Sequence, residues 1–326
     1  MERKKKTRKE MKNKMENNEV IYITGHKNPD TDSIVSALVA EYLFKKLGVN
    51  VKANKQGEVS KETQFVLEAC NLEAPETNTS FKEGTHVILV DHNAKAETLD
   101  NIDELIIDRV IDHHAVKLMV GYPLYYRAEP VGCTNTILYK MYVENNVEIP
   151  QNIAKAMLSA IISDTLLFKS PTCTEEDKIV AKELEHIAKV DAKEYGMELL
   201  KAGTDLSAYT IDEILNLDAK TVEIGDTKGI VAQITTADIP KTMEMQNDLE
   251  EGIKNIIGEK GLDFYILLVT DIINSNSQVI ALGEKAEIVE KAYNDKLENN
   301  TMLVKGLVSR KKQVIPVITE VVTGNN

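Results

Sequence analysis

Tryptophan is absent from this 326-residue sequence, and aromatic residues make up only 5% of it. A surface that stacks single-stranded bases needs aromatic side chains, so the composition disfavours one. Acidic residues outnumber basic ones by 52 to 39, and the net charge is −13. Since general nucleic-acid binding depends on neutralising phosphates, we expect no nucleic-acid partner.

Cysteine is scarce as well, because Cys70, Cys133 and Cys173 stand far apart and show no CxxC spacing. This usage fits a reducing cytoplasm and contains no zinc or redox motif. No apolar run approaches the ~20 residues that span a bilayer, and the basic residues 1–18 lack the apolar segment of a secretory signal. The sequence therefore predicts a cytoplasmic protein without a membrane partner, beginning with a basic, disordered tail.

Hydrophobic patterning divides the rest of the chain into domains at residues 19–203 and 211–326, joined by a polar linker at 204–210. In the first domain, short apolar runs alternate with helical patterns. This alternation predicts an α/β fold with a doubly wound parallel sheet. In the second domain, antiparallel pairs next to helices predict a smaller α+β domain with a mixed sheet.

Two local predictions in the second domain are specific enough to be checked. The pattern from residue 243 to residue 260 predicts one helix. Short strands are expected at residues 306–308 and 314–317, on either side of Ser309-Arg310-Lys311-Lys312.

Polar side chains gather where the first predicted strand ends. The residues from Ile21 to Ile34 read IYITGHKNPDTDSI, with His26, Asp30 and Asp32 at the turn into a helix. In a parallel sheet such a turn lies at the carboxyl edge, where these folds bind ligands. An ordinary turn followed by an N-cap would also explain these residues, so the segment alone leaves both interpretations open.

Later strand and helix ends repeat the pattern, with Asp91 after the run at 87–90, Asp112-His113-His114 after the run at 104–111, and Asp164 after an apolar helix. The candidate ligands are then His26, Asp30, Asp32, Asp91, His113 and Asp164. Carboxylates crowded in this way need a counter-charge. Mixed imidazole and carboxylate ligands suit Mn, Fe, Co or Zn, and six ligands suit two ions about 3.5–4 Å apart. Asp91 is the natural bridge, with Asp164 as a second candidate.

The second domain supplies candidate cations. Arg310, Lys311 and Lys312 form a basic turn, and Lys220 precedes another strand. A basic triplet is usually a solvated loop, yet these side chains also suit phosphoryl oxygens. We expect a phosphate-containing substrate in a cleft between the domains.

Three supporting roles follow from the same pattern. His114 is the spare imidazole, which could bind an oxyanion or protonate a leaving group. Asp112 could orient a ligand imidazole. His86 and His92 are expected to be structural.

The segments GHKNPDTDSI, VDHN, IDHH and SRKK, in this order and spacing, resemble the DHH phosphoesterase superfamily. More closely, they resemble its family II, manganese-dependent inorganic pyrophosphatases. The resemblance begins near Val20 and covers both domains. It implies one metal ion on His26, Asp30 and Asp91, and a second on Asp32, Asp91, His113 and Asp164. It also implies substrate contacts from His114, Lys220, Arg310 and Lys311.

The resemblance further implies two Mn²⁺ ions per subunit, with Co²⁺ as a substitute, and Mg²⁺ arriving with the pyrophosphate. It implies a homodimer formed through the amino-terminal domain. The expected reaction is hydrolysis of pyrophosphate to two orthophosphates by a hydroxide that bridges the metal ions, with Asp91 shared between them and Asp30 or His114 assisting proton transfer.

Three other functions compete with this reaction. An exopolyphosphatase on the same scaffold would share these residues and differ only in the shape of its cleft. A nuclease of the superfamily would carry a glycine-rich carboxy-terminal motif with a His, which this sequence lacks. A catalytically silent phosphate or metal sensor would usually have lost a ligand.

Overall fold

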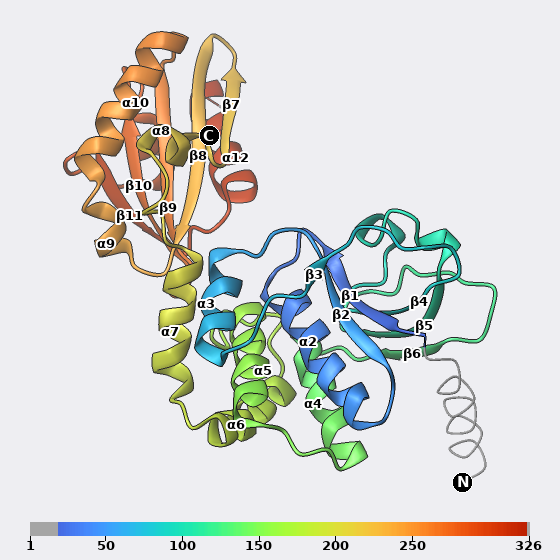
Figure 1. The fold of residues 1–326 in the computed structure, drawn as a ribbon. Coiled ribbons are helices and arrows are strands. Elements are labelled where there is room, and N and C mark those ends of the chain that lie inside the picture. Colours follow the sequence, from blue (N-terminus) through green and yellow to red (C-terminus); the bar gives the residue numbers. More distant parts are fainter. Residues whose placement is uncertain (1–18, 325–326) are drawn as a thin grey trace. The chain divides into compact units, whose positions relative to one another are not determined.

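Residues 19–324 are described by the computed structural model, and they form two compact units that divide between Gly203 and Thr204 (Figure 1). The predicted disordered tail, residues 1–18, lies outside the described residues. Among the described helices, none combines the length and the apolar character that crossing a membrane requires.

The first unit is built on a six-stranded sheet in the order β3-β2-β1-β4-β5-β6, and every neighbouring pair is parallel. The strands are β1 (Ile21–Lys27), β2 (Val51–Gln56), β3 (Glu76–Thr77), β4 (His86–Val90), β5 (Ile106–Asp112) and β6 (Tyr125–Ala128). The chain moves outward from β1 to β3 and then returns to β4 on the other side of β1. Ligands of such open sheets bind at this reversal, at the carboxyl ends of the strands. The predicted doubly wound parallel sheet is confirmed.

Helices cover one face of this sheet, with α2 packed on β1 and β2 and α4 packed on β5 (Figure 1). The helices are α2 (Thr31–Lys46), α3 (Lys61–Cys70), α4 (Thr134–Asn145), α5 (Gln151–Asp164), α6 (Glu175–Ala188) and α7 (Ala192–Gly203). The other face is covered by loops and by the short 3₁₀ turns η1 (Lys95–Glu97) and η2 (Ile102–Glu104). There Val87 and Leu89 of β4 pack against Leu99 and Ile102.

The second unit contains a five-stranded sheet in the order β11-β10-β9-β8-β7. The strands are β7 (Ala219–Ile224), β8 (Thr227–Thr236), β9 (Phe264–Asp271), β10 (Asn276–Leu282) and β11 (Thr301–Lys305). Only β8 and β9 pair in parallel, so the predicted mixed sheet is confirmed. Hydrophobic clusters cover both faces. The helices are α8 (Ile211–Asn216), α9 (Ile239–Met243), α10 (Gln246–Lys260), α11 (Ile288–Tyr293) and α12 (Ile315–Thr323).

The prediction of two strands at residues 306–308 and 314–317 is wrong. Gly306 turns the chain with φ +73°, and Arg310–Val314 form a single π-helical turn, η3, that runs into α12. The β-branched residues here favour a strand by propensity, but Val314 and Ile318 lie four residues apart and are both fully buried. That spacing places them on one helical face, so packing decides the structure.

The helix predicted from residue 243 to 260 is interrupted. α9 ends at Met243, and α10 begins at Gln246. Met243 and Met245, on either side of the interruption, are partly buried against the core cluster on this face.

Candidate metal centre

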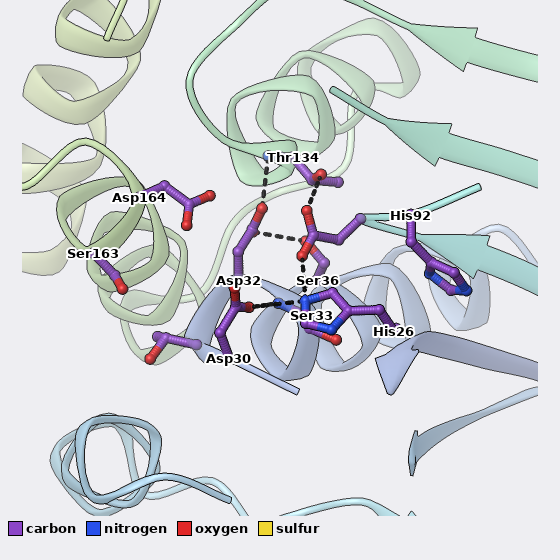
Figure 2. A network of polar contacts seen from close by, with 12 residues as sticks. His26, Asp30, Asp32, Ser33, Ser36, His92, Thr134, Ser163 and Asp164 are labelled. Carbon is purple, nitrogen blue, oxygen red and sulfur yellow. Dashed lines mark hydrogen bonds and ion pairs between the residues drawn. The ribbon is translucent and has the colours of Figure 1, made fainter. Parts of the chain in front are cut away.

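The six predicted ligands of the first unit come from the reversal point of its sheet and from two helices beside it. Figure 2 labels four of them, His26, Asp30, Asp32 and Asp164. His26 lies near the end of β1, Asp91 directly after β4, and His113 directly after β5. Asp30 is the N-cap of α2, and its carboxylate accepts a hydrogen bond of 2.9 Å from the Ser33 N–H. The remaining two ligands are Asp32 in the first turn of α2 and Asp164 at the end of α5.

A glycine allows α2 to approach β1 this closely. A Cβ atom on Gly25 would lie 1.9 Å from Ser33 Oγ and 2.7 Å from the Ser33 carbonyl oxygen. Both distances are well below van der Waals contact, so only glycine fits directly before His26.

Asp91 lies at the centre of the group and is 2% exposed. Its Oδ2 is 3.5 Å from His26 Nε2, and its Oδ1 is 3.3 Å from His113 Nε2. Its backbone is left-handed, with φ +61°, which is uncommon for a residue with a side chain. The two carboxylate oxygens therefore face two different imidazoles, the arrangement that a bridging ligand requires.

Both imidazoles are oriented by backbone carbonyl groups. His26 Nδ1 is 2.7 Å from the Lys27 carbonyl oxygen, and His113 Nδ1 is 3.0 Å from the Val131 carbonyl oxygen. A carbonyl only accepts hydrogen bonds, so each Nδ1 carries a proton and donates it. Nε2 is then the atom that each ring presents to the carboxylates, as in metal-binding histidines.

Asp32 is fully buried and is held by α4 and by its own helix. The N–H of Thr134, in the first turn of α4, donates to Asp32 Oδ2 over 2.8 Å. The Ser36 hydroxyl and the Asn135 side-chain amide donate to Oδ1 over 3.0 and 2.6 Å. The Thr134 hydroxyl also donates to Asp91 Oδ1 over 3.0 Å, so one residue of α4 positions two of the candidate ligands.

The electrostatics of the group call for a cation. Burial, followed by repulsion from the charge of Asp32, raises the pKa values of Asp91 and Asp164 well above the ordinary value for Asp. Asp164 Oδ2 is buried without a hydrogen-bond partner and lies 3.9 Å from His113 Nε2. An unpaired buried acceptor is costly, and a divalent ion would satisfy it.

The donor set fits first-row transition metals, which bind imidazole nitrogen together with carboxylate oxygen. Three sets of residues each bring their possible ligand atoms within 4.8 Å of one another. They are His26, Asp30 and Asp91; Asp91, His113 and His114; and Asp32, Cys133 and Asp164. All six predicted ligands are thus brought together.

His114 has a partner that differs from the expectation for this segment. Asp112 was expected to orient a ligand imidazole, but it binds His114, whose Nδ1 and N–H lie 2.9 and 3.1 Å from Asp112 Oδ1. Burial opposes ionisation of Asp112, yet hydrogen bonds from His114 and Asn93 lower its pKa to about 2. The same bond to Asp112 raises the pKa of His114, which is 55% exposed. The raised pKa favours the protonated, cationic form of His114 beside the ligands.

Two cavities adjoin these residues, and Asp91 and His114 line both of them. One has a volume of about 340 Å³ and is also lined by Asp30, His113 and Asp164. The other has a volume of about 440 Å³, and its lining includes Lys27, Lys117 and Glu97. A small anion has room beside the ligands in either cavity.

The predicted cations of the substrate site lie in the second unit. Lys220 is exposed in β7, and Arg310 and Lys311 begin η3. The guanidinium of Arg310 binds the carboxylate of Asp218 over 2.8 Å, just before β7. Arg310 is therefore held in place close to the start of the strand that carries Lys220.

The structure shows several residues that sequence reasoning did not assign to the site. Asn93 binds Asp112 and also accepts hydrogen bonds from the backbone of Lys117 and Leu118. The others are Cys133, Thr134, Asn135 and Asp177, together with Glu62, whose carboxylate accepts hydrogen bonds from the hydroxyls of Thr31 and Ser163 beside the ligands. Asp177 forms a capping box with Thr174 at the start of α6, and this Thr-x-x-Asp pattern is visible in the sequence.

Two of the remaining histidines have local partners. His86 Nδ1 lies 3.0 Å from the carboxylate of Asp108. His92 is 2% exposed, and its Nδ1 lies 2.8 Å from the Val90 carbonyl oxygen. Burial lowers the pKa of His92 to about 4.

Comparison with known proteins adds independent findings. The model of the DHH family, N-terminal domain, matches residues 20–161, and that of the DHHA2 domain matches residues 197–321. The chain is 51% identical over 304 residues to the manganese-dependent inorganic pyrophosphatase of Bacillus subtilis, covering 93% of this chain and 98% of the relative. It is also 51% identical over 306 residues to a probable manganese-dependent inorganic pyrophosphatase of Bacillus velezensis, covering 93% of this chain and 99% of the relative.

Among solved structures, a putative family II inorganic pyrophosphatase of Methanococcus jannaschii is similar to this chain with a TM-score of 0.60 and 36% identity. The match covers 93% of this chain and 99% of the other.

Proposed function

This chain belongs to the family II, manganese-dependent inorganic pyrophosphatases, and from that premise we propose that it hydrolyses inorganic pyrophosphate to two orthophosphates. The observation that carries the proposal is the position of Asp91, whose two carboxylate oxygens face the Nε2 atoms of His26 and His113. One carboxylate shared in this way suits a pair of divalent ions.

We propose two Mn²⁺ ions per subunit, with Co²⁺ as a substitute, and Mg²⁺ bound together with the substrate. One ion would be held by His26, Asp30 and Asp91, and the other by Asp32, Asp91, His113 and Asp164. When bound, such ions supply positive charge for phosphoryl oxygens and lower the pKa of an attacking water.

The protein's own residues would bind the substrate and move protons. His114 carries a raised pKa and is half exposed, so in its cationic form it can bind a phosphate oxygen or give a proton to the leaving phosphate. Asp30 is 56% exposed and can take up a proton. Lys220, Arg310 and Lys311 would bind the remaining phosphate oxygens through their positive charge.

The direct test is phosphate release by metal-stripped protein reloaded with Mn²⁺ or with Zn²⁺, with Mg²⁺ present throughout. We expect rapid turnover of pyrophosphate with Mn²⁺ and little turnover of tripolyphosphate. Activity confined to tripolyphosphate or longer chains would instead identify an exopolyphosphatase. If the metal-loaded protein hydrolyses neither substrate, a sensor role replaces the enzyme.

Variants test the role of the metal ligands separately from that of the substrate-binding cations. Asp91→Asn should lower kcat more than about 100-fold, because both ions lose a ligand. Asp103→Asn is the matched control, since this exposed carboxylate of η2 lines neither cavity.

The cations of the second unit should affect substrate binding more than metal binding. Arg310→Gln should raise KM for pyrophosphate about tenfold or more and leave Mn²⁺ affinity unchanged. Lys312→Gln, two residues along the chain and exposed, should leave KM unchanged. Equal effects of the two variants would refute a specific role for Arg310.

The proposal extends to the setting of the enzyme. We propose a cytoplasmic homodimer formed through the first unit, with no nucleic-acid partner. The three cysteines, Cys70, Cys133 and Cys173, are free, as a reducing compartment would keep them. Sedimentation of the isolated protein should give about twice the mass of 36.4 kDa.

A further inference from the structure

Cys133 lies among the candidate metal ligands although its sequence context shows no metal-binding motif. It is the N-cap of α4 and is fully buried. Its Sγ lies within 4.8 Å of carboxylate oxygens of both Asp32 and Asp164. A thiol, two carboxylates and a neighbouring imidazole, His113, thus surround one small region.

Two further observations show that this region can accept a ligand. Asp164 Oδ2 is buried and has no hydrogen-bond partner. Asp32 Oδ2 accepts one hydrogen bond in the described structure, from the Thr134 N–H, and a carboxylate oxygen has lone pairs for two. Both carboxylates therefore keep free acceptor capacity next to the sulfur.

The backbone around Cys133 holds its sulfur in place. The N–H of Asn135 donates to Sγ over 3.4 Å, and Sγ lies at the N-terminus of a helix of 12 residues. Burial and the charges of Asp32 and Asp164 raise the pKa of the Cys133 thiol, so the thiol stays protonated until a bound metal ion displaces the proton.

We propose that Cys133 is a conditional metal ligand, which binds thiophilic divalent ions such as Cd²⁺ together with Asp32 and Asp164 but leaves Mn²⁺ uncoordinated by sulfur. The proposal rests on the metal position assigned to Asp32 and Asp164 under the proposed function. Soft thiolates select ions such as Cd²⁺, whereas carboxylates and water suit Mn²⁺. On binding, the Cys133 S–H bond breaks, a sulfur–cadmium bond forms, and the proton is released to solvent.

A physical consequence is that the site would hold soft ions more tightly than its oxygen and nitrogen ligands alone would allow. Such an ion would exclude Mn²⁺ from this position. Cys133 would then act as the residue through which thiophilic metals inhibit the enzyme.

The test is titration of the metal-free, full-length protein with Cd²⁺ alone, followed by the ultraviolet absorption of the cadmium–thiolate bond and by proton release. Wild-type protein should show the absorption band at one equivalent of Cd²⁺. Cys133→Ser should lose the band and bind Cd²⁺ at least about tenfold more weakly. Cys70→Ser and Cys173→Ser are matched controls and should behave as wild type.

Binding of Mn²⁺, followed by electron paramagnetic resonance, separates this role from a structural one. Cys133→Ser should change Mn²⁺ affinity less than about threefold, because the oxygen and nitrogen ligands remain. A band that persists in Cys133→Ser, or one lost in Cys173→Ser, would overturn the proposal. An equal loss of affinity for both ions would do the same, since it would indicate damage to the fold.

A second variant guards against misfolding of the first. Asp164→Asn keeps the thiol and should weaken Cd²⁺ binding without removing the cysteine, so an unaltered Cd²⁺ affinity would also count against the proposal. A cadmium–thiolate band in a protein that does not hydrolyse pyrophosphate would refute the proposed function alone. Pyrophosphate hydrolysis without the band would refute the role of Cys133 alone.

Discussion

Replacing Asp177 should loosen the metal centre from a distance. Asp177 is fully buried at the N-terminus of α6. Its Oδ2 accepts hydrogen bonds from the Gly132 N–H over 2.8 Å and from the Thr174 N–H over 2.7 Å, and its Oδ1 accepts one from the Thr136 hydroxyl over 2.6 Å. The carboxylate therefore joins α6 to the segment that leads into α4.

That segment positions three candidate ligands. The Val131 carbonyl orients His113, and Thr134 donates to Asp32 and to Asp91. Asp177→Ala would leave the buried Gly132 N–H and Thr174 N–H without partners. Each hydrogen bond to a charged group is worth roughly 1.5–3 kcal/mol, and such losses are not additive, so we expect the first unit to lose about 3–5 kcal/mol of unfolding free energy. Mn²⁺ affinity should fall about 10–100-fold, as it does when residues that orient metal ligands are removed.

Two control variants separate the causes. Asp177→Asn can keep its oxygen toward the two N–H groups and its amide toward Thr136, whose hydroxyl can accept, so the stability loss should be about 1–2 kcal/mol. Thr174→Ala removes the cap of α6 but not the bond to Gly132. It should cost about 1 kcal/mol and leave Mn²⁺ affinity unchanged.

The measurements are amide hydrogen exchange at Gly132 and Thr174, urea unfolding, and Mn²⁺ titration followed by electron paramagnetic resonance. In Asp177→Ala, both amides should exchange faster, and Mn²⁺ should bind more weakly. Normal Mn²⁺ affinity in a variant whose Gly132 amide has lost protection would refute the reasoning. It would show that the hydrogen bonds of this segment do not contribute to the free energy of Mn²⁺ binding.

Three further predictions follow from single features. Asp112→Asn should lower the pKa of His114, since the hydrogen bond that His114 donates to the Asp112 carboxylate is the main cause of the raised pKa. The imidazole then loses its proton at lower pH, and a nuclear magnetic resonance titration of metal-free protein checks the shift. Leu166→Ile should destabilise the protein by roughly 1–2 kcal/mol in urea unfolding, although the volume is conserved, because Leu166 has φ +47° and a β-branched residue strongly disfavours this conformation. Adding Mn²⁺ at 100 times its Kd should stabilise the metal-free protein by about 2.7 kcal/mol for each of the two proposed ions, and Asp91→Asn should reduce this gain at the same Mn²⁺ concentration in thermal unfolding.

The sequence was informative where short apolar runs end in polar residues. The strands before Asp91 and before His113 were predicted because their apolar residues form runs too short for a helix. Parallel strands place their carboxyl ends at one edge, so the sequence alone assigns residues that are far apart in the chain to one place. The structure supports that grouping, with imidazole and carboxylate atoms 3.3–3.5 Å apart around Asp91.

Other features could not be predicted because they depend on packing between distant segments. The carboxy-terminal strand at residues 314–317 was predicted from β-branched residues, whereas burial of Val314 and Ile318 makes the segment helical. Cys133 and Thr134 are ordinary in sequence, and only the packing of α4 against the end of β5 and against α2 brings them to the ligands. Asp112 adjoins both His113 and His114, and their spacing alone does not reveal which imidazole it binds.

The backbone at Asp91 shows why the identity of the ligands could be predicted from the sequence, whereas the backbone conformation that orients them could not. A ligand is specified by residue type, because only a few side chains bind divalent ions. Its orientation is specified by local backbone shape, and Asp91 has φ +61° while its N–H donates to the Ile111 carbonyl over 3.0 Å. A left-handed aspartate costs of order 1–3 kcal/mol, so the conformation persists only because the neighbouring strand holds it. Asp91→Gly should therefore keep this backbone shape while losing the bridge. We expect it to be at least as stable as Asp91→Ala in metal-free protein, because glycine adopts φ +61° without strain, and a lower stability of the glycine variant in urea unfolding would show that the turn is not strained.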